Sequence, residues 1–84
     1  MSTNLSSEKI TLAAIKPGQR VQIEYLEPSP LKERLMSMGL VPGTALKVLR
    51  SAPLGDPMAI SVRSYNLSLR LADAQKIIVS TAAL

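Results

Sequence analysis

The 84-residue sequence contains no cysteine and no histidine. Without cysteine the chain forms neither disulfides nor thiolate ligands, so a reducing compartment is its natural setting. Without histidine it lacks the commonest general base and the commonest transition-metal ligand. Its six Asp and Glu residues are scattered singly. We therefore expect no catalytic residues, no metal site and no cofactor, and an enzyme is the least favoured class of function.

Aromatic residues and long apolar runs are also scarce. Phe and Trp are absent and there are two tyrosines, so the stacking platforms with which small barrels bind single-stranded nucleic acid are mostly missing. The same scarcity argues against an aromatic groove for proline-rich peptides. No apolar run approaches the roughly 20 residues that span a bilayer, and the N-terminus lacks the pattern of a signal peptide. The sequence predicts a soluble, cytoplasmic protein.

The charge is positive, with ten Lys and Arg residues and a formal net charge of +4. Such a balance favours contact with acidic surfaces of protein, nucleic acid or lipid. The cations are spread evenly along the chain, however, and ordinary solvation explains them equally well.

Alternation of apolar and polar residues predicts five short strands, at residues 20–25, 44–50, 58–63, 67–71 and 77–79. In the first, the apolar face consists of Val21, Ile23 and Tyr25. The second and third should pair antiparallel through a hairpin whose tip contains Gly55 and Asp56, followed by a short helical turn at 72–76 before the last strand. Strands at this spacing indicate a mostly β fold, a small and strongly bent antiparallel barrel in which the first and last strands meet.

One short helix, residues 30–38, is expected between the first two main strands. Ser29 can cap it and Pro30 suits its first turn. Leu31, Leu35 and Met38 share one face of this helix, which identifies that face as the one to be buried.

Glycines follow the helix and the proline turns. Gly39 should end the helix in the left-handed conformation, with the next residue folding back in a Schellman ending. The frame I-x-P-G-x-x-V-x-I, which starts at Ile15, recurs as L-x-P-G-x-x-L-x-V, starting at Leu40. Each copy should lead through a proline-glycine turn into a strand, with Gly18 in the first turn and Pro42 and Gly43 in the second, which is predicted to be type II. The organisation predicted is a polar tail (1–9), one domain (10–80) and a short C-terminal tail (81–84).

Three segments in this order resemble the FeoA family: KPGQRVQI, RLMSMGLVPGTALKVLRSAPLGDPMAISV and YNLSLRLADAQKIIV. The resemblance covers residues 10 to 80 and implies an SH3-like barrel similar to the C-terminal domain of iron-dependent repressors. The chain departs from the family at one turn, where a glycine is common. Ser64, Tyr65 and Asn66 occupy that turn here, so Ser64 or Asn66 is expected to be left-handed.

The resemblance also implies a function. Members of this family are thought to act on FeoB, the membrane ferrous-iron transporter, through its cytosolic GTP-hydrolysing portion. The chain is therefore predicted to be a non-catalytic accessory protein of ferrous-iron uptake that contacts the membrane only through this partner. The sequence leaves open whether the protein forms a homo-oligomer. Two alternatives are a small basic barrel that binds nucleic acid, which the scarcity of aromatic residues disfavours, and a regulatory module of a transcriptional repressor system.

Four residues are candidates for contact with the partner. Arg34 and Arg70 match the family pattern and suit an acidic partner, although Arg34 bridging the helix to the barrel through Asp73 or Glu33 is an equal alternative. Leu54 lies at the hairpin tip, where it either contacts a partner or packs on a tyrosine. Met36 lies off the apolar helix face and can adapt to varied partners.

Overall fold

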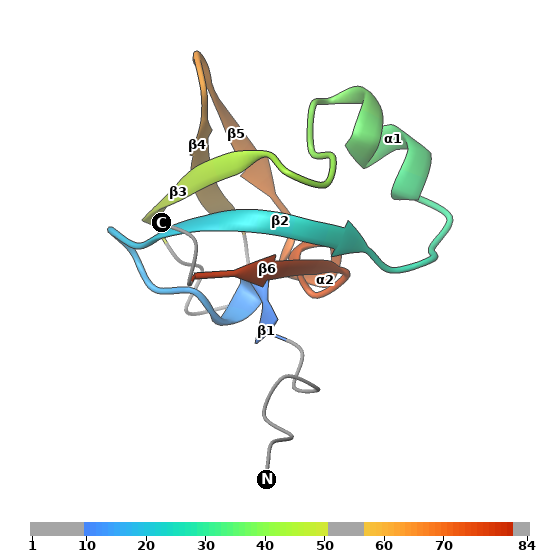
Figure 1. Ribbon diagram of the computed structural model, residues 1–84, viewed down its shortest axis with the longest axis horizontal. Coiled ribbons are helices and arrows are strands. Elements are labelled where there is room, and N and C mark those ends of the chain that lie inside the picture. Colours follow the sequence, from blue (N-terminus) through green and yellow to red (C-terminus); the bar gives the residue numbers. More distant parts are fainter. Residues whose placement is uncertain (1–9, 51–56, 82–84) are drawn as a thin grey trace, which may run out of the picture.

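The computed structural model describes residues 10–50 and 57–81, which form six strands and three short helices (Figure 1). Leu54, Gly55 and Asp56 at the predicted hairpin tip lie outside the described residues, as do residues 1–9 and 82–84 of the predicted tails. In chain order the elements are β1 (Ile10–Thr11), the 3-10 helix η2 (Leu12–Ala14), β2 (Arg20–Leu26), α1 (Lys32–Ser37), β3 (Ala45–Arg50), β4 (Met58–Val62), β5 (Tyr65–Leu69), α2 (Leu71–Ala74) and β6 (Ile77–Ser80).

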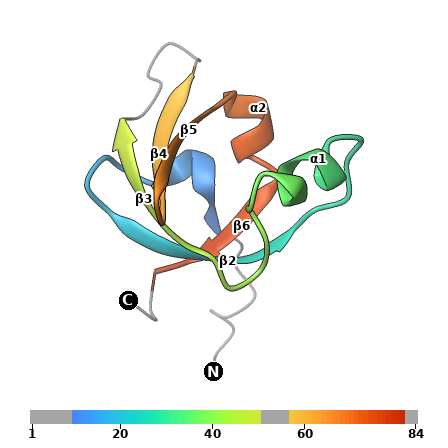
Figure 2. The same ribbon diagram turned by 90° about the horizontal axis from the view of Figure 1, so that it is seen from above.

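All strands belong to one antiparallel sheet with the order β1-β6-β2-β3-β4-β5. The first and last main strands, β2 and β6, pair as predicted, and the mostly β, bent antiparallel fold is confirmed. The sheet curls around the interior, with η2 inside the curve (Figure 2). In the described part of the chain β1 and β5 are free edges, so strand pairing does not close the barrel. The expectation of about five strands was too low, because Ile10 and Thr11 add a short strand to β6.

Each of the two proline-glycine turns donates a backbone hydrogen bond to the strand that follows the other turn. The Gly18 N–H donates to the Val48 carbonyl at 2.7 Å, and the Gly43 N–H donates to the Ile23 carbonyl at the same distance. Both glycines have positive φ, +90° and +95°, which is the conformation that the type II turn requires. Val21 and Leu46, which occupy equivalent places in the two frames, are direct partners in the sheet. The β2–β3 pair is therefore nearly two-fold symmetric.

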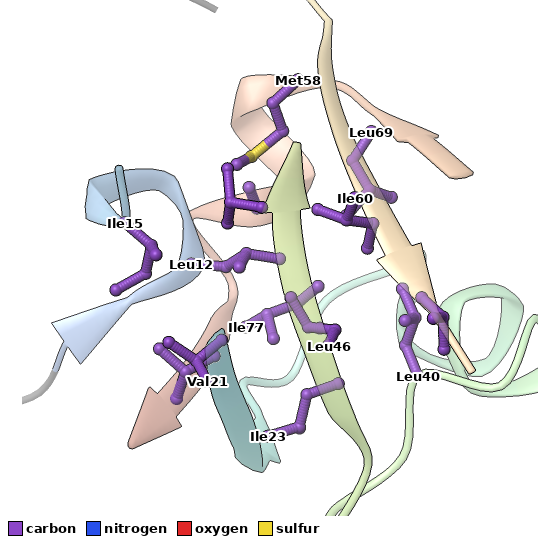
Figure 3. Packing of buried hydrophobic residues seen from close by; sticks show 14 of the residues in the cluster. Leu12, Ile15, Val21, Ile23, Leu40, Leu46, Met58, Ile60, Leu69 and Ile77 are labelled. Atoms are coloured by element: carbon purple, nitrogen blue, oxygen red, sulfur yellow. The ribbon is translucent and has the colours of Figure 1, made fainter. Parts of the chain in front are cut away.

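The core fills the inside of the curled sheet (Figure 3). Alternate residues of the central strands point inward, and the ends are filled from η2, α1 and α2. Its buried members are Leu12, Ile15, Val21, Ile23, Leu26, Leu35, Leu40, Leu46, Val48, Met58, Ile60, Val62, Leu69, Ala74, Ile77 and Val79. The described residues include no buried polar or charged side chain, so burial of apolar area is the main source of stability.

The inward face of β2 differs from the prediction at Tyr25. Ile23 pairs with Val79 and Tyr25 with Ile78, which leaves Glu24 as an extra residue in β2. A bulge of this kind reverses the alternation beyond it. Tyr25 is consequently 38% exposed and Leu26 takes the core position.

Helix α1 is shorter than residues 30–38, because Pro30 and Leu31 form a turn before it. The Ser29 hydroxyl oxygen accepts a hydrogen bond from the Leu31 N–H at 3.2 Å, and the Ser29 carbonyl accepts one from the Lys32 N–H at 3.1 Å. Ser29 thus organises the turn that leads into α1.

The end of α1 has both hydrogen bonds of a Schellman motif. The Leu40 N–H donates to the Leu35 carbonyl at 3.1 Å, and the Gly39 N–H donates to the Met36 carbonyl at 3.0 Å. Gly39 has a φ of +98°, and a Cβ added there would collide with the Tyr65 hydroxyl, which donates a hydrogen bond to the Met38 carbonyl. Gly39 is therefore required both by its backbone conformation and by the close approach of Tyr65.

The turn between β4 and β5 lies earlier than predicted. Val62 pairs with Tyr65, so the loop consists of Arg63 and Ser64. Among the described non-glycine residues only Arg63 has positive φ, +49°, which corrects the expectation for Ser64 or Asn66. A two-residue loop with positive φ at its first position is the type II′ pattern, which favours glycine there. The strand after this turn, β5, ends at Leu69, so Leu71 begins α2 instead of ending the predicted strand 67–71. Helix α2 ends at Ala74 rather than at residue 76.

The close approach at Gly39 is testable against Gly18, which has a similar φ but no atom within 4 Å of an added Cβ. Gly18→Ala should lower the free energy of unfolding by about 1–2 kcal/mol, the cost of a left-handed alanine. Gly39→Ala should cost at least about 1 kcal/mol more, because it also overpacks against Tyr65. In a Tyr65→Phe background this excess should shrink, since the ring carbon that bears the hydroxyl is 3.6 Å from the added atom. Equal costs for the two alanines in urea denaturation would contradict the close approach.

The strained turn residue gives a second prediction. Arg63→Gly should raise the free energy of unfolding by about 0.5–1 kcal/mol, because glycine adopts positive φ without the Cβ penalty and this gain exceeds its extra freedom in the unfolded chain. The matched control is Ser64→Gly, which changes a residue without positive φ and should not raise the free energy of unfolding. Thermal melts of both variants measure the difference, and a destabilised Arg63→Gly protein is the opposing result.

Candidate functional site

The face of α1 that the sequence identified as a core face is only partly buried. Leu35 is 2% exposed and Met38 is half-buried, whereas Leu31 remains 37% exposed. Arg34 lies on the same stripe, because residues at positions i, i+3, i+4 and i+7 of a helix line up. The stripe therefore presents apolar surface and a cation side by side.

A cleft of about 420 Å³ separates this stripe from the end of β5 and the start of α2. We call it the α1–β5 cleft. Its walls are Leu31, Arg34, Leu35 and Met38 on one side and Ser68, Leu69, Arg70 and Asp73 on the other. β5 has a free edge here, and Figure 1 shows α1 standing to one side of the sheet. The cleft is an opening between an amphipathic helix and a sheet edge, which is a geometry suited to a protein partner.

One end of α1 is tied firmly to the barrel. The Tyr65 hydroxyl, from the start of β5, donates to the Met38 carbonyl, and the Thr44 hydroxyl donates to the Gly39 carbonyl at 3.1 Å. Leu40 follows directly and is fully buried in the core. These contacts fix the C-terminal end of the helix and so set the width of the cleft.

The structure brings Arg34 and Arg70 together on this cleft, from two elements that are far apart in the sequence. Both side chains are exposed. Within residues 10–50 and 57–81 neither guanidinium forms an ion pair, so the alternative in which Arg34 bridges to Asp73 or Glu33 is not what the fold shows. Each arginine keeps its planar set of donors for a carboxylate of a partner.

Of the other two candidates, only Met36 lies within the described residues, and it does not line the cleft. Met36 is 37% exposed on α1 but belongs to neither wall. Leu54 lies outside the described residues. The sequence reasoning missed Leu31 as an exposed residue, because its helical spacing is that of a core position.

No metal-binding arrangement is found in the described ranges 10–50 and 57–81. No group of three or more His, Cys, Asp or Glu residues there is placed to hold a metal ion. The helices of the same ranges are all too short or too polar to cross a membrane. The cleft can hydrogen-bond through two guanidinium groups, the Asp73 carboxylate and the Ser68 hydroxyl, and it can make contact with apolar side chains.

The curled antiparallel sheet with short helices has the form of a small SH3-like domain. The crystal structure of zinc-complexed FeoA from Stenotrophomonas maltophilia, described as an SH3 domain protein, matches 87% of this chain and 92% of its own with a TM-score of 0.77. At 22% identity this likeness concerns the fold alone. The NMR structure of a FeoA-like protein from Clostridium acetobutylicum is 33% identical, has a TM-score of 0.79, and is matched over 89% of this chain and 88% of that chain.

Residues 10–81 match the FeoA domain family, and the chain belongs to it. This family is associated with ferrous-iron transport, and its domain is a small accessory one that is not known as catalytic. A curated relative from Porphyromonas gingivalis is the Fe(2+) transport protein A/Fe(2+) transporter FeoB fusion protein, 44% identical over 67 residues. Those residues are 79% of this chain, which spans only 8% of the fusion protein.

Because the two cleft arginines are exposed and form no ion pair in the described part of the chain, we predict that their loss leaves folding intact. Arg34→Ala and Arg70→Ala should each change the free energy of unfolding by less than about 0.5 kcal/mol. Leu35→Ala, in the same helix but buried, should cost about 2–5 kcal/mol because it leaves a cavity. Urea denaturation distinguishes the two classes. A loss of more than 1 kcal/mol for either arginine variant would indicate a structural role.

Proposed function

We propose that this chain is a non-catalytic accessory protein of ferrous-iron uptake that binds the cytosolic, GTP-hydrolysing part of the FeoB transporter and works in the cytoplasm. The observation that carries this proposal is the α1–β5 cleft, in which Arg34 and Arg70 lie with Asp73 beside the exposed Leu31 and form no ion pair within residues 10–50 and 57–81. An apolar anchor next to two cations suits a partner segment that offers an apolar side chain and carboxylates.

Family membership and gene fusion support the choice of partner. The relative from P. gingivalis joins a transport protein A segment and FeoB in a single chain. Two segments that are joined in a single chain commonly act together. The proposal extends this association to the chain described here and assigns the contact to the cleft.

The residue composition supports a role without catalysis. The whole chain contains neither His nor Cys, so nucleophilic and general-base chemistry would have to rely on isolated carboxylates, hydroxyls or lysines. A protein of this kind acts on a transporter by binding and orienting it rather than by chemistry of its own.

Binding of the full-length protein to FeoB of the same organism, purified in lipid nanodiscs, tests the proposal. Biolayer interferometry should detect association in at least one of the nucleotide-free, GDP-bound and GTP-analogue-bound states. Arg34→Glu and Arg70→Glu should weaken binding by about 1–3 kcal/mol, mainly through slower association, because exposed charges steer the encounter. Leu31→Asp should instead raise the dissociation rate, because it removes an apolar anchor.

Two further variants locate the contact. Met36→Asp tests whether the partner also covers the far side of α1. Leu49→Asp is the matched control, because Leu49 is 41% exposed on β3 but does not line the cleft. A melting curve for each variant excludes unfolding as the cause. The proposal is wrong if wild-type protein binds FeoB in no nucleotide state, and the assignment to the cleft is wrong if all cleft variants bind like wild type.

A further inference from the structure

The outer face of the central strands carries a second hollow, separate from the α1–β5 cleft. Its volume is about 300 Å³. Three cationic side chains surround it, and the small side chain of Ala45 lies between them. We call this hollow the basic groove and define it by Arg20, Ala45, Leu46, Lys47, Ser61 and Arg63.

The register of the sheet produces this arrangement. Arg20 of β2 is the direct partner of Lys47 of β3, and Lys47 is the direct partner of Ser61 of β4. These three residues form a row across the outer face. Leu46 pairs with Val62, so Ala45 and Arg63 come next along the two chains, and both line the hollow. A hollow with a positive rim follows from the pairing alone.

Two features of the groove are locally unfavourable to folding. Arg20 and Lys47 are like charges placed directly opposite each other, which destabilises a pair of strands. Arg63 has positive φ, +49°, which is uncommon for a residue with a Cβ. Among the described residues, no carboxylate lines the groove to offset the charge. Local departures from good folding chemistry that gather at one place point to a function there.

An apolar hollow of about 550 Å³ continues the groove. The two share Ala45 and Arg63. Tyr65, which is 39% exposed, forms part of its wall. Its other apolar lining residues are Val41, Pro42 and Val62. The combined surface is elongated, with a cationic end and an apolar end.

We propose that this combined surface binds an acidic protein segment. At least two carboxylates of the segment pair with Arg20, Lys47 and Arg63, and an adjacent apolar side chain enters the hollow beside Tyr65. A free oxyanion would leave the apolar end empty. Single-stranded nucleic acid is disfavoured, because its bases need aromatic platforms and the chain contains no Phe or Trp. Carboxylates next to an apolar side chain match both ends of the surface.

The probe is the capped peptide acetyl-EELEEL-amide, and its counterpart is acetyl-QQLQQL-amide. Both are titrated into the full-length, ¹⁵N-labelled protein and followed by NMR. The acidic peptide should shift the amides of β2, β3 and the β4–β5 turn in a saturable way and bind at least about tenfold tighter than the glutamine peptide. Raising the salt concentration from about 0.05 to 0.5 M should weaken the binding, because these charges are exposed.

Two variants separate binding from folding. Lys47→Glu should abolish binding of the acidic peptide yet raise the melting temperature by about 2–4 °C, because it replaces a like-charge pair with an opposite-charge pair. Arg63→Asn should weaken binding about fivefold while keeping a residue that tolerates positive φ. Lys76→Glu is the control: it makes the same change in net charge at an exposed cation outside the groove and should bind within about twofold of wild type.

Four results would overturn the proposal. The first is equal binding of the two peptides, and the second is amide shifts confined to the α1–β5 cleft. The third is a peptide affinity that Lys47→Glu and Arg63→Asn leave unchanged. The fourth is that inorganic phosphate or phosphatidylglycerol vesicles produce the expected amide shifts and the acidic peptide does not. The last result would assign the groove to phosphate chemistry. None of the four bears on binding of FeoB at the cleft, which is measured with the transporter itself.

Discussion

The reciprocal pairing of the two proline-glycine turns is the constraint on which the rest of the structure depends. Each turn glycine donates its N–H to the middle of the other strand, from Gly18 to Val48 and from Gly43 to Ile23. A slip of one residue between β2 and β3 would leave both N–H donors without partners and turn Val21 and Leu46 out of the core. The free-energy cost of these losses would be large compared with the stability of a small domain. The register of the whole sheet follows from this pair.

The same register determines both faces of the sheet. On the inside it places Val21 against Leu46, and on the outside it places Arg20 against Lys47. The favourable inner contact and the unfavourable outer one are therefore inseparable, because successive residues of a strand point to opposite faces. Burial of the inner residues outweighs a repulsion between exposed charges, since surface charge pairs contribute at most about 1 kcal/mol. The fold can thus carry a concentrated positive charge at little cost.

Much of this architecture can be predicted from local patterns. Alternation identified the buried faces of β3 and β4, where Leu46, Val48 and Ile60 are all buried, and turn chemistry located Gly39 at the end of α1. The bulge at Glu24 and the strained Arg63 could not be predicted, because each depends on a partner strand that the local pattern does not reveal. For the same reason the sequence identified Arg34 and Arg70 only as separate candidates for contact with a partner. Their meeting across a cleft depends on how the end of α1 is tied to β5.

Tyr65 is the residue through which the two surfaces meet. Its ring forms part of the wall of the apolar hollow, while its hydroxyl holds the Met38 carbonyl at the end of α1, which borders the α1–β5 cleft. Gly39 makes this contact possible, since any side chain there would push Tyr65 away. One side chain thus contributes both to the anchoring of the end of α1 and to the wall of the apolar hollow.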